Sequence, residues 1–124
     1  MRRIAKAVEP NVANEVNRTA GLILSTVVPA TPVDTGRARG NWQVSTARSI
    51  TSEINRLDQN GGSTISLGQS RINTRPRGAT IYICNNVPYI QRLNDGYSAQ
   101  APAGFVQLAV RAAVAHVRNA RILR

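Results

Sequence analysis

Two stretches of helical apolar periodicity, one near each end of the chain, limit the fold more than any other feature of the sequence. Near the N-terminus the apolar side chains recur every three or four positions, at Val12, Val16, Ala20, Ile23 and Val27. This spacing predicts an amphipathic helix over about residues 10–28, with Pro10 in its first turn and Pro29 and Pro32 ending it. An Ala-rich stretch predicts a second helix over about residues 104–121. Its expected apolar stripe consists of Val106, Val110, Ala113 and Val117.

The segment between these helices contains short β-forming runs separated by glycine and proline turns. Alternation of apolar and polar residues from Trp42 onward predicts a strand over about residues 40–50. The run ATIYIC predicts a central strand over about residues 79–85, and a short helix is expected over 88–93. Residues 57–78 fit either a strand or a short helix; the helix, capped by Ser63, is slightly favoured.

This order of elements predicts an α+β fold, in which a small antiparallel β-sheet packs against an N-terminal and a C-terminal helix. The length of 124 residues fits a single domain spanning residues 1–124. Only 4% of the residues are aromatic although 42% are hydrophobic. The core must therefore consist mainly of small aliphatic side chains, and such a core would gain stability from a partner.

The charge is strongly basic, with 16 Lys and Arg against 6 Asp and Glu, a formal net charge of +10. All but one of these cations are arginine, whose planar fork fits carboxylate and phosphate equally well. The excess therefore fits an acidic protein face or nucleic acid, unless it reflects only a coding bias toward arginine.

The residue types needed for catalysis or metal binding are few and scattered. His116 and Cys84 are the only histidine and cysteine, and the six acids are far apart in the sequence. We therefore expect no enzymatic activity, no metal and no cofactor. The GRARG segment also lacks the length, the lysine and the hydroxyl of a phosphate-binding P-loop. No apolar run is long enough to span a bilayer, so we expect a soluble protein that is made without export.

The run TPVDTGRARGNWQ, residues 31–43, contains the chain's only tryptophan. Asp34 and the flanking proline and glycine predict a stiff turn, with Asp34 bonding the backbone just ahead of it. Arg37 and Arg39 are expected to direct charge toward something outside the subunit. Trp42 is expected to anchor the following strand in a core or an interface rather than to stack on a base.

Two stretches resemble a known family: TPVDTGRARGNW at residues 31–42 and NNVPYIQRLNDGYSAQAPAGFVQLAV at residues 85–110. Together they are similar to the head-tail joining proteins of tailed bacteriophages, which are called neck, tail-completion or tail-terminator proteins. The matching order covers residues 12 to 118, with residues 49–78 matching only in outline. Asn94-Asp95-Gly96 stands where members of the family often have Glu-Tyr-Gly.

The resemblance implies a non-enzymatic virion structural protein, made in the host cytoplasm and located at the neck of the particle. It implies a ring of copies between the portal side of the head and the tail tube, in contact with neighbouring connector and tail proteins. Six copies would match the tail tube, and twelve would match the portal. Our candidate contacts with neighbours, or with packaged DNA through phosphate alone, are Arg37, Arg39, Trp42, Arg92 and Arg111. The alternative hypothesis is a small basic nucleic-acid-binding protein.

Overall fold

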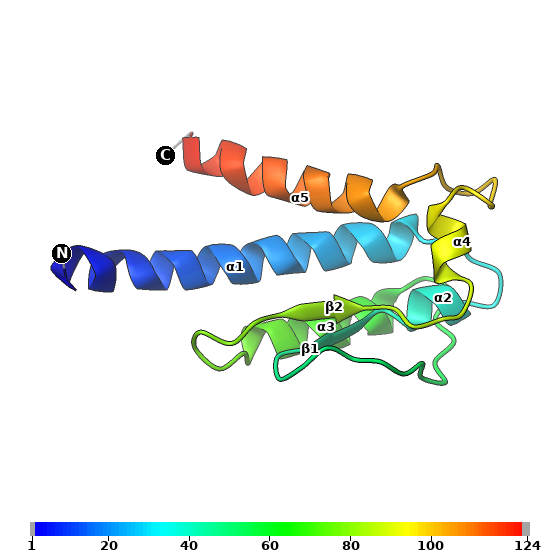
Figure 1. The fold of residues 1–124 in the computed structure, drawn as a ribbon, viewed down its shortest axis with the longest axis horizontal. Coiled ribbons are helices and arrows are strands. Elements are labelled where there is room, and N and C mark those ends of the chain that lie inside the picture. Colours follow the sequence, from blue (N-terminus) through cyan, green and yellow to red (C-terminus); the bar gives the residue numbers. More distant parts are fainter. Residues whose placement is uncertain (1, 123–124) are drawn as a thin grey trace.

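The computed structural model describes the backbone of residues 2–122 and the side chains of residues 14–117. The elements are the helices α1 (Arg2–Ala30), α2 (Arg37–Gly40), α3 (Gly62–Asn73), α4 (Ile90–Asn94) and α5 (Phe105–Ile122), and the strands β1 (Gln43–Ser45) and β2 (Tyr82–Cys84). The two long helices lie side by side and run in opposite directions, and α2 and α4 lie near one end of the pair (Figure 1). The α+β class is confirmed.

Helix α1 is the middle layer of the structure. Helix α5 packs along it on one side, and α3 and the two-stranded sheet lie on the other (Figure 1). The strands are antiparallel, with Val44 opposite Ile83 and Ser45 opposite Tyr82. Because directly opposed residues point to the same face of a sheet, Val44 and Ile83 share the face that packs toward the helices.

The core is formed where α1 meets both neighbouring layers. On α1 the buried apolar side chains are Ala20, Leu24, Val27 and Val28. The expected stripe was partly wrong, because Val16 is 41% exposed and Ile23 is only half-buried. A helix that is covered on two sides buries a wider and differently centred arc than a one-sided amphipathic helix. Val12 lies outside the described side chains.

The close approach of α5 to α1 likewise changes which side chains α5 buries. Its buried positions are Phe105, Ala109, Ala113 and Val117, whereas Val110 is 37% exposed. Alanine at the contact allows two helix backbones to lie close together, so the small side chains rather than Val110 face α1. The bounds of α5 agree with the expected helix to within one residue.

Both strands are shorter than expected, and β2 is not a central strand. The side chain of Ser45 accepts hydrogen bonds from the N–H groups of Ala47 and Arg48, at 3.3 and 3.4 Å. This local turn takes the chain out of the sheet after Ser45. Tyr82, which faces Ser45, is therefore the first paired residue of β2, and within the described residues β2 pairs with β1 alone.

Three helix boundaries differ from the expectation. Helix α1 begins at Arg2 rather than near Pro10, because residues 2–9 include strong helix formers. At its other end it continues through Pro29 and ends at Ala30. Helix α4 starts two residues later than expected.

Helix α3 confirms the favoured reading of the middle segment, but Ser63 does not cap it. Gly61 is the capping residue. The Asp58 carboxylate accepts bonds from the N–H groups of Gly61 and Thr64 and from the Thr64 hydroxyl.

The contact of α3 with α1 and β1 depends on the absence of a side chain at Gly68. A Cβ there would collide with Leu24 and lie 3.0 Å from Val44 Cγ2, and both of these side chains are buried. We expect Gly68→Ala to lower the free energy of unfolding, because a collision with two buried side chains lies at the upper end of the usual overpacking cost of about 1–3 kcal/mol and exceeds the gain of about 1 kcal/mol from better helix propensity. Urea unfolding measures this. Ser66→Ala, at an exposed position of the same helix, is the control; equal stability of the two variants would contradict the packing argument.

Candidate assembly surface

The TPVDTGRARGNWQ run forms a tight turn followed by the single-turn helix α2. Gly36 has a φ of 90°, and a Cβ there would lie 2.6 Å from the backbone nitrogens of Asp58 and Gln59. Only glycine combines this backbone conformation with so close a neighbour. The role expected for Asp34 was wrong: its side chain is exposed, and the Thr35 hydroxyl accepts the Arg37 N–H instead, at 3.3 Å.

Arg39 is engaged within the subunit. Its guanidinium donates to the carbonyls of Pro29, Thr31 and Gln59, at 2.9, 2.7 and 2.7 Å. The Pro29 carbonyl lies in the last turn of α1 and the Thr31 carbonyl just after it, where carbonyls lack helical partners and the helix dipole favours a cation. Arg39 therefore fastens the end of α1 to the segment that precedes α3.

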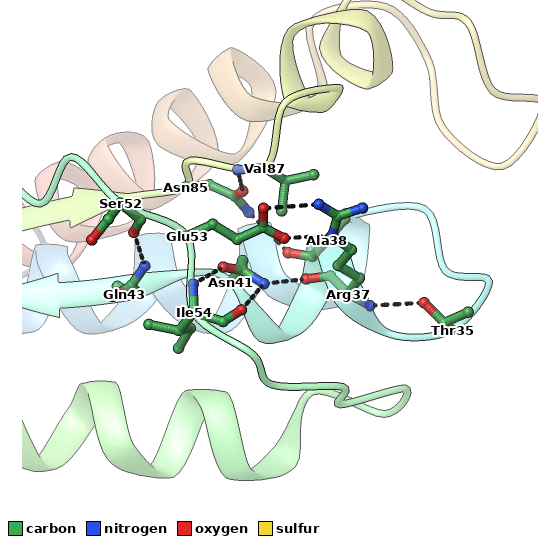
Figure 2. A network of polar contacts seen from close by, with 10 residues as sticks. All are labelled: Thr35, Arg37, Ala38, Asn41, Gln43, Ser52, Glu53, Ile54, Asn85 and Val87. Atoms are coloured by element: carbon green, nitrogen blue, oxygen red, sulfur yellow. Dashed lines mark hydrogen bonds and ion pairs between the residues drawn. The ribbon is translucent and has the colours of Figure 1, made fainter.

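Arg37 forms an ion pair with Glu53, which lies in the irregular segment between β1 and α3 (Figure 2). The hydrogen bond from Arg37 holds the pKa of Glu53 below its usual value of 4.5; the opposite charge adds to this shift, and desolvation opposes it. The same bond raises the pKa of Arg37. The Arg37 side chain is 42% exposed, so part of it still faces solvent.

Asn41 lies beneath this ion pair and is fully buried (Figure 2). Its amide donates to the carbonyls of Arg37 and Ile54 and accepts from the Ile54 N–H, at 2.9, 3.0 and 2.8 Å. One side chain thus supplies the paired donor and acceptor that a neighbouring strand would supply to Ile54.

Trp42 anchors the core, which is one of the two places, core or interface, expected for it. It is 6% exposed, and its indole N–H donates to the Thr31 hydroxyl at 2.8 Å. That hydroxyl in turn donates to the Val27 carbonyl at 2.7 Å. The burial leaves no face of the ring on which a base could stack, and the bonds connect the turn to the last turn of α1.

The second family-like stretch packs directly against the first. The Asn85 amide donates to the Ala38 carbonyl at 2.8 Å, and Arg37 lies over the Tyr89 ring, 5.3 Å from its centre. The Gln100 amide accepts from the N–H of Val33 and donates to its carbonyl, at 2.8 and 2.9 Å. A small cleft of about 220 Å³ lies between them, lined by Pro32, Val33, Asp34, Thr35, Arg37, Ala38, Tyr89, Leu93, Ser98 and Gln100. We call the surface around this cleft the motif surface.

Large exposed side chains flank the motif surface. Tyr97, just after α4, is 78% exposed, and Arg92 lies over its ring at 5.9 Å. Leu57, 66% exposed, lines a second hollow together with Arg37 and Glu53. Arg92 on α4 and Arg111 on α5 are both exposed, and neither lines one of these two hollows.

His116 and Cys84, the only histidine and cysteine of the chain, lie on different elements. His116 is exposed on α5, and Cys84 in β2 contacts Ser49 through its sulfur at 3.7 Å. Across the described part of the chain, no three His, Cys, Asp or Glu side chains gather as metal ligands. In that same part, none of the helices combines the length and apolar character needed to cross a bilayer.

Several residues that build the motif surface were not identified from the sequence. Asn41 and Asn85 bond to backbone across wide sequence separations, and Glu53 is 16 residues from Arg37. Asparagine near glycine or proline does signal irregular backbone: Asn41 directly follows Gly40, and Asn85 stands three residues before Pro88, so that signal could have marked both. Nothing in the spacing of Glu53 points to its partner.

No match to the chain was found among known protein families, curated proteins or solved structures.

The ion pair between Arg37 and Glu53 gives a pH-dependent prediction. Because folding lowers the pKa of Glu53, its contribution to stability is present above pH 4.5 and is lost as the pH falls through the folded-state value. We expect Glu53→Gln to be less stable than the wild type at pH 7, and to lose less melting temperature between pH 7 and pH 3. Thermal unfolding followed by circular dichroism measures both effects.

The control for this prediction is Asp34→Asn, which removes the same charge from an exposed side chain outside the ion pair. Asp34→Asn should lose as much melting temperature between pH 7 and pH 3 as the wild type. If Glu53→Gln loses that full amount as well, the ion pair does not stabilise this segment.

Proposed function

We propose that the chain is a structural protein of the bacteriophage head-tail connection, which assembles as a ring through the motif surface. The observation that carries this proposal is the contact between the two family-like stretches. Residues 31–42 and 85–110 are far apart in the sequence, yet they share the Asn85, Arg37–Tyr89 and Gln100 contacts and one cleft. Residues that resemble one family at two separate places thus belong to one surface.

The character of this surface supports a protein contact rather than a reaction site. Its backbone is fastened by Arg39, Asn41 and Gln100, so docking would cost little ordering entropy. Tyr97 and Leu57 are exposed to solvent at its flanks. Tyrosine and arginine are enriched among the residues that dominate protein interfaces, and exposed apolar side chains beside them help to exclude water.

The internal bonds of the two loop arginines refine their proposed role. Arg39 has its donors directed at backbone carbonyls of its own subunit, so it supports the surface from within. Arg37 keeps a partly exposed guanidinium, and Arg92 stands beside Tyr97. Arg37 and Arg92 are therefore the stronger candidates for an acidic neighbour, and Arg111 serves any separate contact made by α5.

A ring requires a heterologous interface, in which the motif surface of one copy meets a different face of the next. Six copies remain the expected number, with twelve as the alternative, and connector and tail proteins would cover the two faces of the ring. A virion location follows from this assembly and is part of the proposal.

The test is the mass of the purified chain in solution, measured by sedimentation and by imaging of single particles. We expect the wild type to form closed rings at micromolar concentration. Leu57→Ser and Tyr97→Ala should shift it to monomers without changing its melting temperature, because both side chains are exposed. Truncation of a hot-spot residue costs roughly 2 kcal/mol or more of binding free energy.

Leu67→Ser is the matched control, because Leu67 is also an exposed leucine, at 44%, but lies on α3 away from the motif surface. It should leave the rings intact. A wild-type chain that stays monomeric and binds duplex DNA tightly, losing affinity by orders of magnitude between low and moderate salt, would contradict the proposal. That result would support the nucleic-acid-binding alternative.

A further inference from the structure

Helix α1 has a third stripe that neither α5 nor the layer of α3 and the sheet covers fully. Val16, Thr19, Ile23, Thr26 and Ala30 follow one another at spacings of three and four residues, so they lie along one side of the helix. The first three line a hollow of about 680 Å³, and the last two line a hollow of about 330 Å³. The two hollows therefore succeed one another along the same side of α1. We call this surface the α1 groove.

The walls of the α1 groove come from β2 and α5. Ile81, just before β2, and Ile83, within it, line its larger part. Both are only half-buried, because α3 packs against β1, where Val44 is buried, rather than against β2. Phe105 and Leu108 line the smaller part, and Leu108 is 49% exposed. An apolar floor with aliphatic walls is suited to a further apolar segment.

The dimensions favour a helix as the occupant. From Val16 to Ala30 the stripe rises by about 21 Å along the axis of α1, which is the length of about 14 helical residues. An extended segment would need backbone partners, and β2 offers only three residues of strand. A helix needs only side-chain contacts, which α1 provides over its whole stripe.

The charge favours an acidic occupant from a different protein. Among the described side chains, Arg75 and Arg77 line the larger hollow together with one acid, Glu15. Arg75 is held there by bonds to the Asn17 side chain and the Ala79 carbonyl, at 2.8 and 2.7 Å. A second copy of the chain would bring another +10 and has no cluster of acids to offer this rim.

We propose that the α1 groove binds an acidic amphipathic helix of another protein, with the apolar stripe of that helix against α1 and β2 and its acids toward Arg75 and Arg77. The larger hollow of the α1 groove shares no residue with the cleft of the motif surface, and the smaller hollow shares only Gln100 with it. The proposal therefore goes beyond ring formation and can hold whether or not rings form.

The experiment uses the full chain and three labelled synthetic peptides of about 16 residues, long enough to span the stripe as a helix. The first has leucine at every third or fourth position and glutamate elsewhere. The second has lysine in place of glutamate, and the third has the composition of the first with its leucine spacing scrambled. We expect the first peptide to bind, by fluorescence anisotropy, about tenfold or more tightly than either of the others.

Val16→Glu and Val114→Glu form a matched pair of variants, because the two valines are 41% and 40% exposed and only Val16 lines the α1 groove. Val16→Glu places a like charge on the groove floor and should weaken binding of the acidic peptide about tenfold. Val114→Glu should leave that binding unchanged. Circular dichroism checks that both variants keep the wild-type fold.

Failure of the acidic peptide to bind, equal binding of the lysine peptide, or equal effects of the two variants would overturn the proposal. A further contrary outcome is self-association of the wild type that Val16→Glu abolishes and the acidic peptide cannot displace. That result would assign the α1 groove to a second copy of the chain and would also overturn the proposal. Leu57→Ser separates ring formation through the motif surface from helix binding in the α1 groove. This variant should lose the rings and still bind the acidic peptide as the wild type does.

Discussion

The structure depends on satisfying the backbone of the irregular segment between β1 and α3, residues 46–61. A connection of this length without regular structure has many polar groups that need partners. Side chains supply them: Asn41 pairs with Ile54, Arg39 bonds to the Gln59 carbonyl, and Asn86 donates to the Ile50 carbonyl at 2.9 Å. These bonds hold the segment against α2, Asn41 directly after it and the residues that follow β2.

The same bonds connect the ends of several elements at one end of the molecule. Arg39 joins the C-terminus of α1 to this segment, and the Asp58 N–H donates to the Gly36 carbonyl at 3.1 Å before the Asp58 carboxylate caps α3. The result is a surface whose shape is fixed before any partner arrives. Preformed surfaces of this kind bind with a smaller entropic cost than loops that order on docking. This is why we assign the proposed ring contact to the motif surface.

The surplus of arginine has more than one role. Arg39 and Arg56 use their guanidinium groups to bond backbone carbonyls, and Arg37 forms an ion pair within the subunit. Arginine suits such positions because its fixed fork can bond two or three carbonyls at once. A net charge of +10 therefore overstates the positive charge that is directed at partners, and the position of each arginine decides its role.

The sequence by itself determined the α+β class and the two long helices, because apolar periodicity and turn residues act locally along the chain. It favoured a helix over a strand for α3 and left Trp42 as an anchor in a core or an interface; packing decided for the core. Tertiary structure decided which side of α1 is buried, because that depends on α5 and α3 approaching from two directions. It decided the partners of Arg37, Arg39 and Asn41 as well, since these bonds join residues whose separation in the sequence follows no period. Local patterns fix elements, whereas contacts between distant residues exist only once those elements have packed.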